Sequence, residues 1–154
     1  MRIGRSHWGA SLVAVLATGG LVAGCGGSSD SSTTTAALSK SEFVAKADAI
    51  CERGDKRIEA AAERYLGPGR PTRAQFVRFA NAAVVPQTQQ IVDGIRALDP
   101  PADVADTVDQ MIADAQSVND RLKADPEELA SSEDPFADVN RLAKEAGLDA
   151  CAGD

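Results

Sequence analysis

An apolar stripe in the second half of the chain most constrains what this sequence can fold into. Between positions 104 and 122, apolar residues recur in alternating steps of four and three: Val104, Val108, Met111, Ala115, Val118 and Leu122. This spacing places them on one face of an α-helix, in a pattern similar to a heptad repeat. The sequence therefore predicts a helix here that buries this face in a core.

Two further helix starts are marked by capping boxes, in which the first residues of a helix bond reciprocally. These are Ser39-x-x-Glu42 and Thr72-x-x-Gln75, which predict helices beginning at 39 and 72. Each is followed by apolar or small residues in steps of three and four. The first stripe is Phe43, Ala47, Ile50, Cys51, Gly54, Ile58, Ala62 and Tyr65, and the second is Phe76, Phe79, Ala80, Ala83, Val84, Ile91, Ile95 and Leu98.

Glycine and proline residues indicate where these helices end or bend. The segment 66–71 contains Gly-Pro-Gly and must end the first helix, and Asp99-Pro100-Pro101 ends the second. Pro86 lies inside the second stripe, where it removes a backbone donor and should kink or split the helix. Such a kink can be accommodated in a bundle, or it can shape a pocket.

The sequence of the C-terminal region predicts a short helical turn followed by a last helix. Asp125-Pro126-Glu127-Glu128 resembles a helix N-terminus, Pro135 suits the first position of a helix, and Gly147 suits a C-terminal stop. Leu148 and Cys151 should then fold back against the bundle. The inward residues of the last helix are predicted to be Phe136, Val139, Leu142 and Ala146.

The N-terminus carries the parts of a bacterial export signal in the expected order. Arg2 and Arg5 supply positive charge, and an apolar run follows over 10–23. This run is shorter than the roughly 20 residues that a membrane-spanning helix needs. Val22-Ala23-Gly24-Cys25 looks like a bacterial lipobox, although a secretory signal with a chance cysteine is the alternative.

The lipobox predicts a processing event and a location. We expect residues 1–24 to be removed as a lipoprotein signal peptide and Cys25 to become an acylated N-terminus that carries palmitate. Residues 25–37 are rich in Gly, Ser and Thr and predict a flexible linker before a folded domain over 38–154. Acyl chains would hold the protein on the extracytoplasmic face of the bacterial cell membrane.

Two cysteines remain after Cys25, at Cys51 and Cys151. An exported chain meets an oxidising compartment, so these two favour a disulfide. A redox or metal pair is the alternative, but there is no CxxC spacing and no neighbouring histidine. Since alternating strand patterns are also absent, the predicted fold is all-α, a four-helix-bundle-like domain closed by a Cys51–Cys151 disulfide.

Charge and histidine content argue against several classes of function. The chain has 16 basic residues, 23 acidic residues and one histidine. Removal of the signal takes away Arg2, Arg5 and His7, which leaves a formal net charge of −9 (14 − 23). Nucleic-acid binding needs a basic surface, so no nucleic-acid partner is expected. Without histidine, the usual general base and the commonest zinc ligand are missing, and we predict no catalytic residue, no metal site and no cofactor.

Two features of the sequence leave room for a ligand site. Tyr65, Phe76 and Phe79 lie close together across the Gly-Pro turn and can wall a small apolar pocket, although aromatic residues at helical spacing more often belong to a core. The third helix carries many acidic residues, which form either a solvated face or a weak site for a divalent cation. These are Asp99, Asp103, Asp106, Asp109, Asp114 and Asp120.

Three short motifs resemble a known group of proteins. They are Ala47-Asp48-Ala49-Ile50-Cys51, Leu98-Asp99-Pro100-Pro101-Ala102 and Ala146-Gly147-Leu148-Asp149-Ala150-Cys151. Across 38–151 the chain looks like uncharacterised small lipoproteins of actinobacterial type, from high-GC Gram-positive bacteria. The resemblance implies that the first and last motifs hold the disulfide cysteines, and it implies no activity.

The sequence thus favours a membrane-anchored, extracytoplasmic helical module that binds a protein partner or another ligand and is not an enzyme. One alternative is a carrier of a small apolar ligand or lipid, which needs an internal cavity of a few hundred Å³. Another is a carboxylate-based enzyme or an accessory subunit of one, which needs buried carboxylates close to each other. No ligand-binding residue can be named from the sequence.

Overall fold

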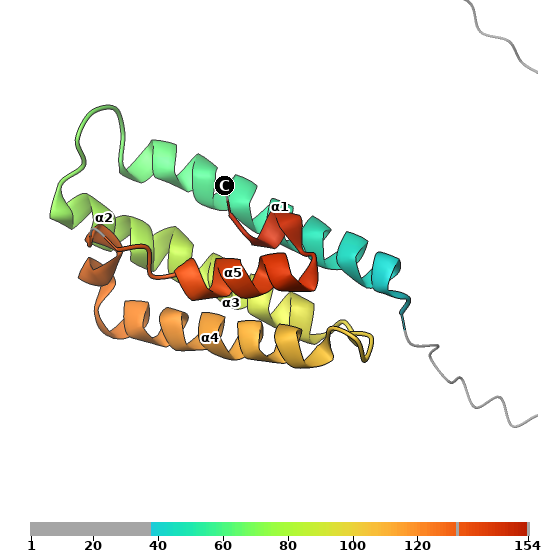
Figure 1. Ribbon diagram of the computed structural model, residues 1–154. Helices are drawn as coiled ribbons and strands as arrows, with labels where there is room; N and C mark the ends of the chain where they lie inside the picture. The colour runs from blue at the N-terminus through green and yellow to red at the C-terminus, as the bar shows by residue number, and fades with distance from the viewer. Residues whose placement is uncertain (1–37, 132, 154) are drawn as a thin grey trace, which may run out of the picture. The chain divides into compact units, whose positions relative to one another are not determined.

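Figure 1 shows the computed structural model of the chain, which describes residues 38–131 and 133–153. The predicted signal peptide 1–24, the predicted lipidation site Cys25 and the predicted linker 25–37 lie outside the described residues. Within the described part there is no strand. The α-helices are α1 (Lys40–Tyr65), α2 (Arg73–Phe79), α3 (Val85–Arg96), α4 (Ala105–Ala124) and α5 (Ala137–Ala146). Three short turns accompany them: the π-helical turn η1 (Ala80–Val84) between α2 and α3, the 3₁₀ turn η2 (Pro126–Ala130) after α4, and the 3₁₀ turn η3 (Asp149–Cys151) after α5.

Both predicted capping boxes are present and begin the first two helices. The hydroxyl of Ser39 accepts a hydrogen bond from the Glu42 amide at 3.3 Å, and the Glu42 carboxylate accepts one from the Ser39 amide at 3.0 Å. Thr72 and Gln75 bond in the same way at the start of α2. These contacts satisfy amides that a helix N-terminus otherwise leaves without partners.

Pro86 is accommodated by a change of helical register directly before it. The π-helical turn η1 connects α2 to α3, and Pro86 occupies the first turn of α3. A proline ring clashes with the carbonyl four residues earlier in a regular α-helix, and a wider π turn at this place relieves that crowding. The helix therefore continues through the proline, with α2, η1 and α3 as one arm (Figure 1).

The last helix begins later than the sequence suggested. Pro135 lies in the turn before α5 and is not its first residue, because α5 starts at Ala137. The Asp134 carboxylate accepts a hydrogen bond from the Phe136 amide at 2.9 Å, which stabilises that turn in place of another helical residue. The predicted stop at Gly147 is confirmed, with a left-handed φ of 79°.

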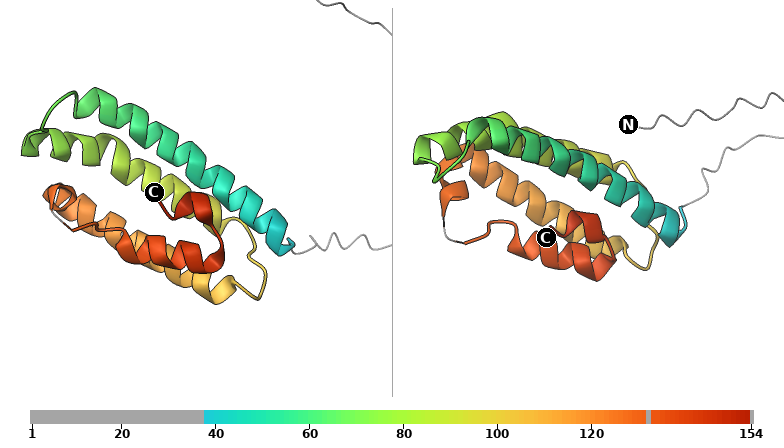
Figure 2. Two further views of the ribbon diagram at one scale, coloured as in Figure 1. Left: turned by 45° about the horizontal axis from the view of Figure 1, so that its top comes forward. Right: turned by 90° about the horizontal axis from the view of Figure 1, so that it is seen from above.

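The described residues form four helical arms, which are α1, the continuous α2–η1–α3 arm, α4 and α5 (Figures 1 and 2). Helix α3 packs against both α1 and α4, and α4 packs against α5. The α5 arm connects to α1 largely through η3, which lies on α1. An all-α, four-helix-bundle-like domain is therefore confirmed, with its first and last arms bridged by the C-terminal turn.

The apolar stripe of α4 lies in the core, as its spacing predicted. All of its residues are at most 8% exposed. It crosses two apolar clusters, one that contains Phe43 and Leu148 and one near the α1–α2 turn that contains Phe79 and Leu122. One continuous face of α4 thus connects both halves of the core.

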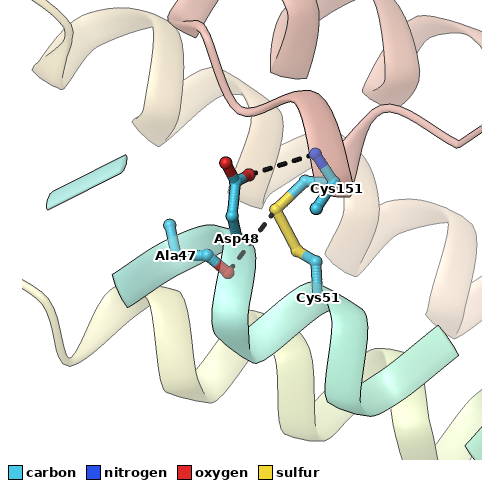
Figure 3. The surroundings of a disulfide bond; sticks show 5 residues. Ala47, Asp48, Cys51 and Cys151 are labelled. Carbon is cyan, nitrogen blue, oxygen red and sulfur yellow. Dashed lines mark hydrogen bonds between the residues drawn. A yellow bond between two sulfur atoms is a disulfide. The ribbon is translucent and has the colours of Figure 1, made fainter. Parts of the chain in front are cut away.

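The predicted disulfide is confirmed and joins α1 to η3. The Cα atoms of Cys51 and Cys151 lie 5.1 Å apart, within the range that a disulfide can bridge. Figure 3 shows that Asp48 lies beside it and accepts a hydrogen bond from the Ala150 amide at 3.1 Å. The sulfur of Cys151 contacts the Ala47 carbonyl oxygen at 3.8 Å, and since a disulfide sulfur carries no proton this is a packing contact.

Candidate functional site

A cavity of about 330 Å³ lies inside the bundle, and every arm contributes to its wall. Its floor is made of buried apolar residues from α2 through α4. These are Phe79, Val84, Val92, Ile95, Met111, Ile112 and Ala115, each at most 8% exposed. The floor therefore belongs to the same core that holds the bundle together.

The rim of the cavity lies on the opposite side, between α1 and the segment from η2 to α5. Its apolar residues are all half-buried, and they are Ile58, Leu129, Phe136 and Val139. Because the floor is buried and these residues are partly exposed, the cavity opens to solvent on this side. The opening exists because α5 is connected to α1 mainly at η3 and leaves the rest of that flank less closely packed.

The disulfide forms one end of the cavity wall. Cys51 and Cys151 both line it, together with Gly153 in the C-terminal tail. The bridge joins positions 100 residues apart in sequence. It therefore fixes the position of the tail relative to α1 and limits how far the cavity can open at this end.

Few polar side chains reach the cavity. Thr88 is buried at 8% exposure on the α3 wall, while Asp55 and Asn140 are half-buried and Asp134 is exposed at the rim. The Asp134 carboxylate also accepts a hydrogen bond from the Asn140 side-chain amide at 3.3 Å. A largely apolar cavity with a few polar groups is typical of sites for small molecules.

A second, smaller pocket of about 160 Å³ lies between α1 and α3. Its wall includes Arg53 and Arg57, and the Arg57 guanidinium donates hydrogen bonds to Gln87 at 3.4 Å and to Gln90 at 2.9 Å. These side chains are exposed or half-buried. The pocket is a small groove with a partly polar wall, and none of its polar side chains is buried.

A polar cluster connects α3 and α4 elsewhere in the bundle. The side-chain oxygen Oε1 of Gln89 accepts hydrogen bonds from the side chains of Gln116, Asn119 and Lys123 at 3.2 to 3.3 Å. Asn119 is fully buried, and its own side-chain oxygen has no partner among the described residues. Such an orphaned acceptor costs free energy.

The acidic residues of the third predicted helix do not gather at the cavity. Asp103 pairs with Lys40 at 3.1 Å, and Asp120 pairs with Lys123 at 3.0 Å. Asp114 accepts a hydrogen bond from Gln110 at 2.8 Å. Among the described residues, no group of three or more histidine, cysteine, aspartate or glutamate side chains is placed to hold a metal ion.

The sequence prediction of a pocket walled by Tyr65, Phe76 and Phe79 is only partly met. Phe79 lines the cavity, whereas Tyr65 and Phe76 do not. Sequence reasoning missed the polar residues of the wall, although a signal was present. Thr88 follows Val84 by four positions on the second stripe, and Asp55 follows Cys51 by four on the first. A polar residue on an apolar helix face is a candidate cavity residue.

Comparison of the chain with protein-family models, with curated proteins and with solved structures finds no match. None of the described helices has the length and hydropathy that a bilayer crossing requires. The candidate site is therefore defined by its own geometry, which is an apolar cavity with an acidic rim and a disulfide at one end.

Proposed function

We propose that this protein is a binding module that holds a small apolar or amphiphilic molecule inside its helical domain. The observation that carries the proposal is the cavity of about 330 Å³ among the four arms. This volume lies within the range of about 300–1,000 Å³ that is usual for small-molecule sites. Its buried apolar floor would release water on binding, which is the main favourable contribution for an apolar ligand.

The proposed location rests on the sequence at the N-terminus. We infer that Cys25 is acylated after removal of 1–24 and that the linker 25–37 tethers the domain to the extracytoplasmic face of the membrane. The Cys51–Cys151 disulfide is in keeping with an oxidising compartment. A tethered domain would meet amphiphilic molecules at high local concentration near the bilayer.

Titration with the neutral fluorescent probe N-phenylnaphthylamine tests the proposal. All measurements use the full chain with Cys25→Ser, which prevents acylation. We expect saturable fluorescence enhancement at one probe per chain. The Val139→Trp variant should reduce binding, because Val139 is half-buried on the cavity rim and the much larger indole ring of tryptophan would occupy the opening.

Val44→Trp is the matched control. Val44 is also half-buried and packs against the same core cluster, but it does not line the cavity. The same substitution there should leave probe affinity unchanged. Equal loss of binding in both variants, or enhancement that never saturates, would mean that the probe does not bind in the cavity.

A further inference from the structure

We propose that the cavity selects amphiphiles whose polar end is cationic, such as a long-chain alkylammonium, over neutral and anionic ones. This inference rests on the proposed function, because it assigns the chemical class of the ligand to the same cavity. It is carried by the separation of the cavity into an apolar floor and a rim whose charges have one sign.

The ionisable groups of the rim are carboxylates. Among the described residues that line the cavity, Asp55 and Asp134 are acidic and none is basic. Asp55 projects from α1, while Asp134 lies in the segment before α5. The two carboxylates therefore come from the two elements that flank the opening, whereas the floor beneath is apolar.

This separation orients an amphiphile in the cavity. The alkyl chain gains most by contact with the buried floor, which includes Val92, Ile95 and Met111. Its polar end then lies at the rim, where Asp55 and Asp134 attract a cation. A carboxylate or sulfate end at the same place would be repelled by both residues.

Asp134 is held in a defined position for this role. Its carboxylate accepts hydrogen bonds from the Phe136 amide at 2.9 Å and from the Asn140 side chain at 3.3 Å. A carboxylate offers about four lone-pair sites, so these two bonds leave capacity for a further donor. An ammonium group is a donor without acceptor capacity, and it suits a rim of this composition.

The two arginines closest to Asp55 in sequence belong to a different surface. Arg53 and Arg57 line the smaller groove between α1 and α3, where Arg57 donates to Gln87 and Gln90. Neither arginine lines the main cavity. An anionic end at the rim would therefore have no basic partner among the described residues of the cavity wall.

Displacement of N-phenylnaphthylamine by three ligands of equal chain length tests the inference. Decylammonium, decanol and decanoate are each titrated below the concentration at which they aggregate, at neutral pH and at low and high salt. We expect decylammonium to bind about two- to fivefold more tightly than decanol, since partly exposed ion pairs contribute modestly. Decanoate should bind more weakly than decanol, and high salt should reduce both differences.

Two double variants separate the rim from the overall charge of the chain. Asp55→Asn/Asp134→Asn should abolish the preference for decylammonium over decanol while decanol still binds. The control Asp109→Asn/Glu63→Gln removes the same formal charge from two exposed residues outside the cavity wall. This control should keep the preference, because its carboxylates do not face the ligand.

Each outcome decides one of the two proposals. Equal affinity for the three ligands in the unsubstituted rim would overturn the cationic preference and leave the proposed binding function standing. Failure of all three to displace the probe would also overturn the cationic preference, whereas the proposed binding function is decided separately by saturable probe binding and its loss in Val139→Trp. If a rim variant does not fold, the ranking of the three ligands and its salt dependence with the native rim still decide the inference.

Discussion

Gly54 of α1 lies directly beneath Ile91 of α3. A Cβ atom at Gly54 would stand 2.4 Å from Ile91 Cδ1 and 2.7 Å from Ile91 Cγ1. A second pair repeats this arrangement with the two helices exchanged, because a Cβ atom at Gly94 of α3 would stand 3.1 Å from Ile50 Cγ2 of α1. Glycine disfavours a helix by about 1 kcal/mol relative to alanine, and close packing of the two arms offsets that cost.

Gly54→Ala should destabilise the domain by about 1 kcal/mol. Displacement of Ile91 costs about 1–3 kcal/mol, and the better helix propensity of alanine returns roughly 1 kcal/mol of this. Urea denaturation followed by circular dichroism measures the change. In an Ile91→Val background, which removes Cδ1, the same substitution should cost less, and strict additivity of the two changes would contradict the predicted contact.

Loss of the disulfide should lower the free energy of unfolding by about 4–5 kcal/mol, the value expected for a loop of about 100 residues in the chain-entropy treatment. The Cys51→Ala/Cys151→Ala variant tests this by denaturation, with reduced native protein as a second comparison. Because both cysteines line the cavity, the variant should also bind N-phenylnaphthylamine more weakly. A variant as stable as the native protein would contradict the predicted contribution of the bridge.

Asp48 should make stability depend on pH in an unusual direction. Burial raises the pKa of its carboxyl group, and the nearby charges of Asp149 and Glu52 add to this, while the hydrogen bond from Ala150 opposes it. A raised pKa means that the folded state holds the proton more tightly than the unfolded state. The contribution of Asp48 is therefore most favourable at low pH and is lost as pH rises through the folded-state pKa.

Asp48→Asn keeps an acceptor for the Ala150 amide and removes the charge. We expect the variant to be more stable than the native protein at pH 7, by about 0.5 kcal/mol. That advantage should shrink as pH falls toward about 3.9, the ordinary pKa of aspartate. Thermal melts of both proteins across pH 3–7 measure it, and Asp48→Ala, which loses the acceptor, should be less stable at every pH.

Met111→Ala and Leu122→Ala should separate stability from binding. Both residues are at most 3% exposed on α4, so each truncation should cost about 2–5 kcal/mol in denaturation experiments. Met111 lines the cavity and Leu122 does not. Probe affinity should therefore change in Met111→Ala alone, and an equal change in both variants would place the probe outside the cavity.

The local features of this protein could be predicted from sequence because they depend on residues a few positions apart. Ser39 and Thr72 cap their helices through bonds to residues three positions later. The α4 stripe predicted its buried face from spacing alone. The cysteine pair was predictable from chemistry, since two cysteines in a chain predicted to be exported favour a disulfide. The predicted helix start at Pro135 was wrong, because the hydrogen bond from the Phe136 amide to the Asp134 carboxylate stabilises a turn there.

Only the tertiary structure decided where the cavity lies and which residues surround it. Asp55 and Thr88 follow the apolar stripes of separate helices, but their joint presence at one cavity depends on how α1, α3 and α5 pack. Helix periodicity specifies which face is buried and leaves the partner of that face open, since apolar burial is not directional. The closeness of α1 to α3 at Gly54 and the wider flank between α1 and α5 arise from side-chain packing across arms, and that packing creates the site.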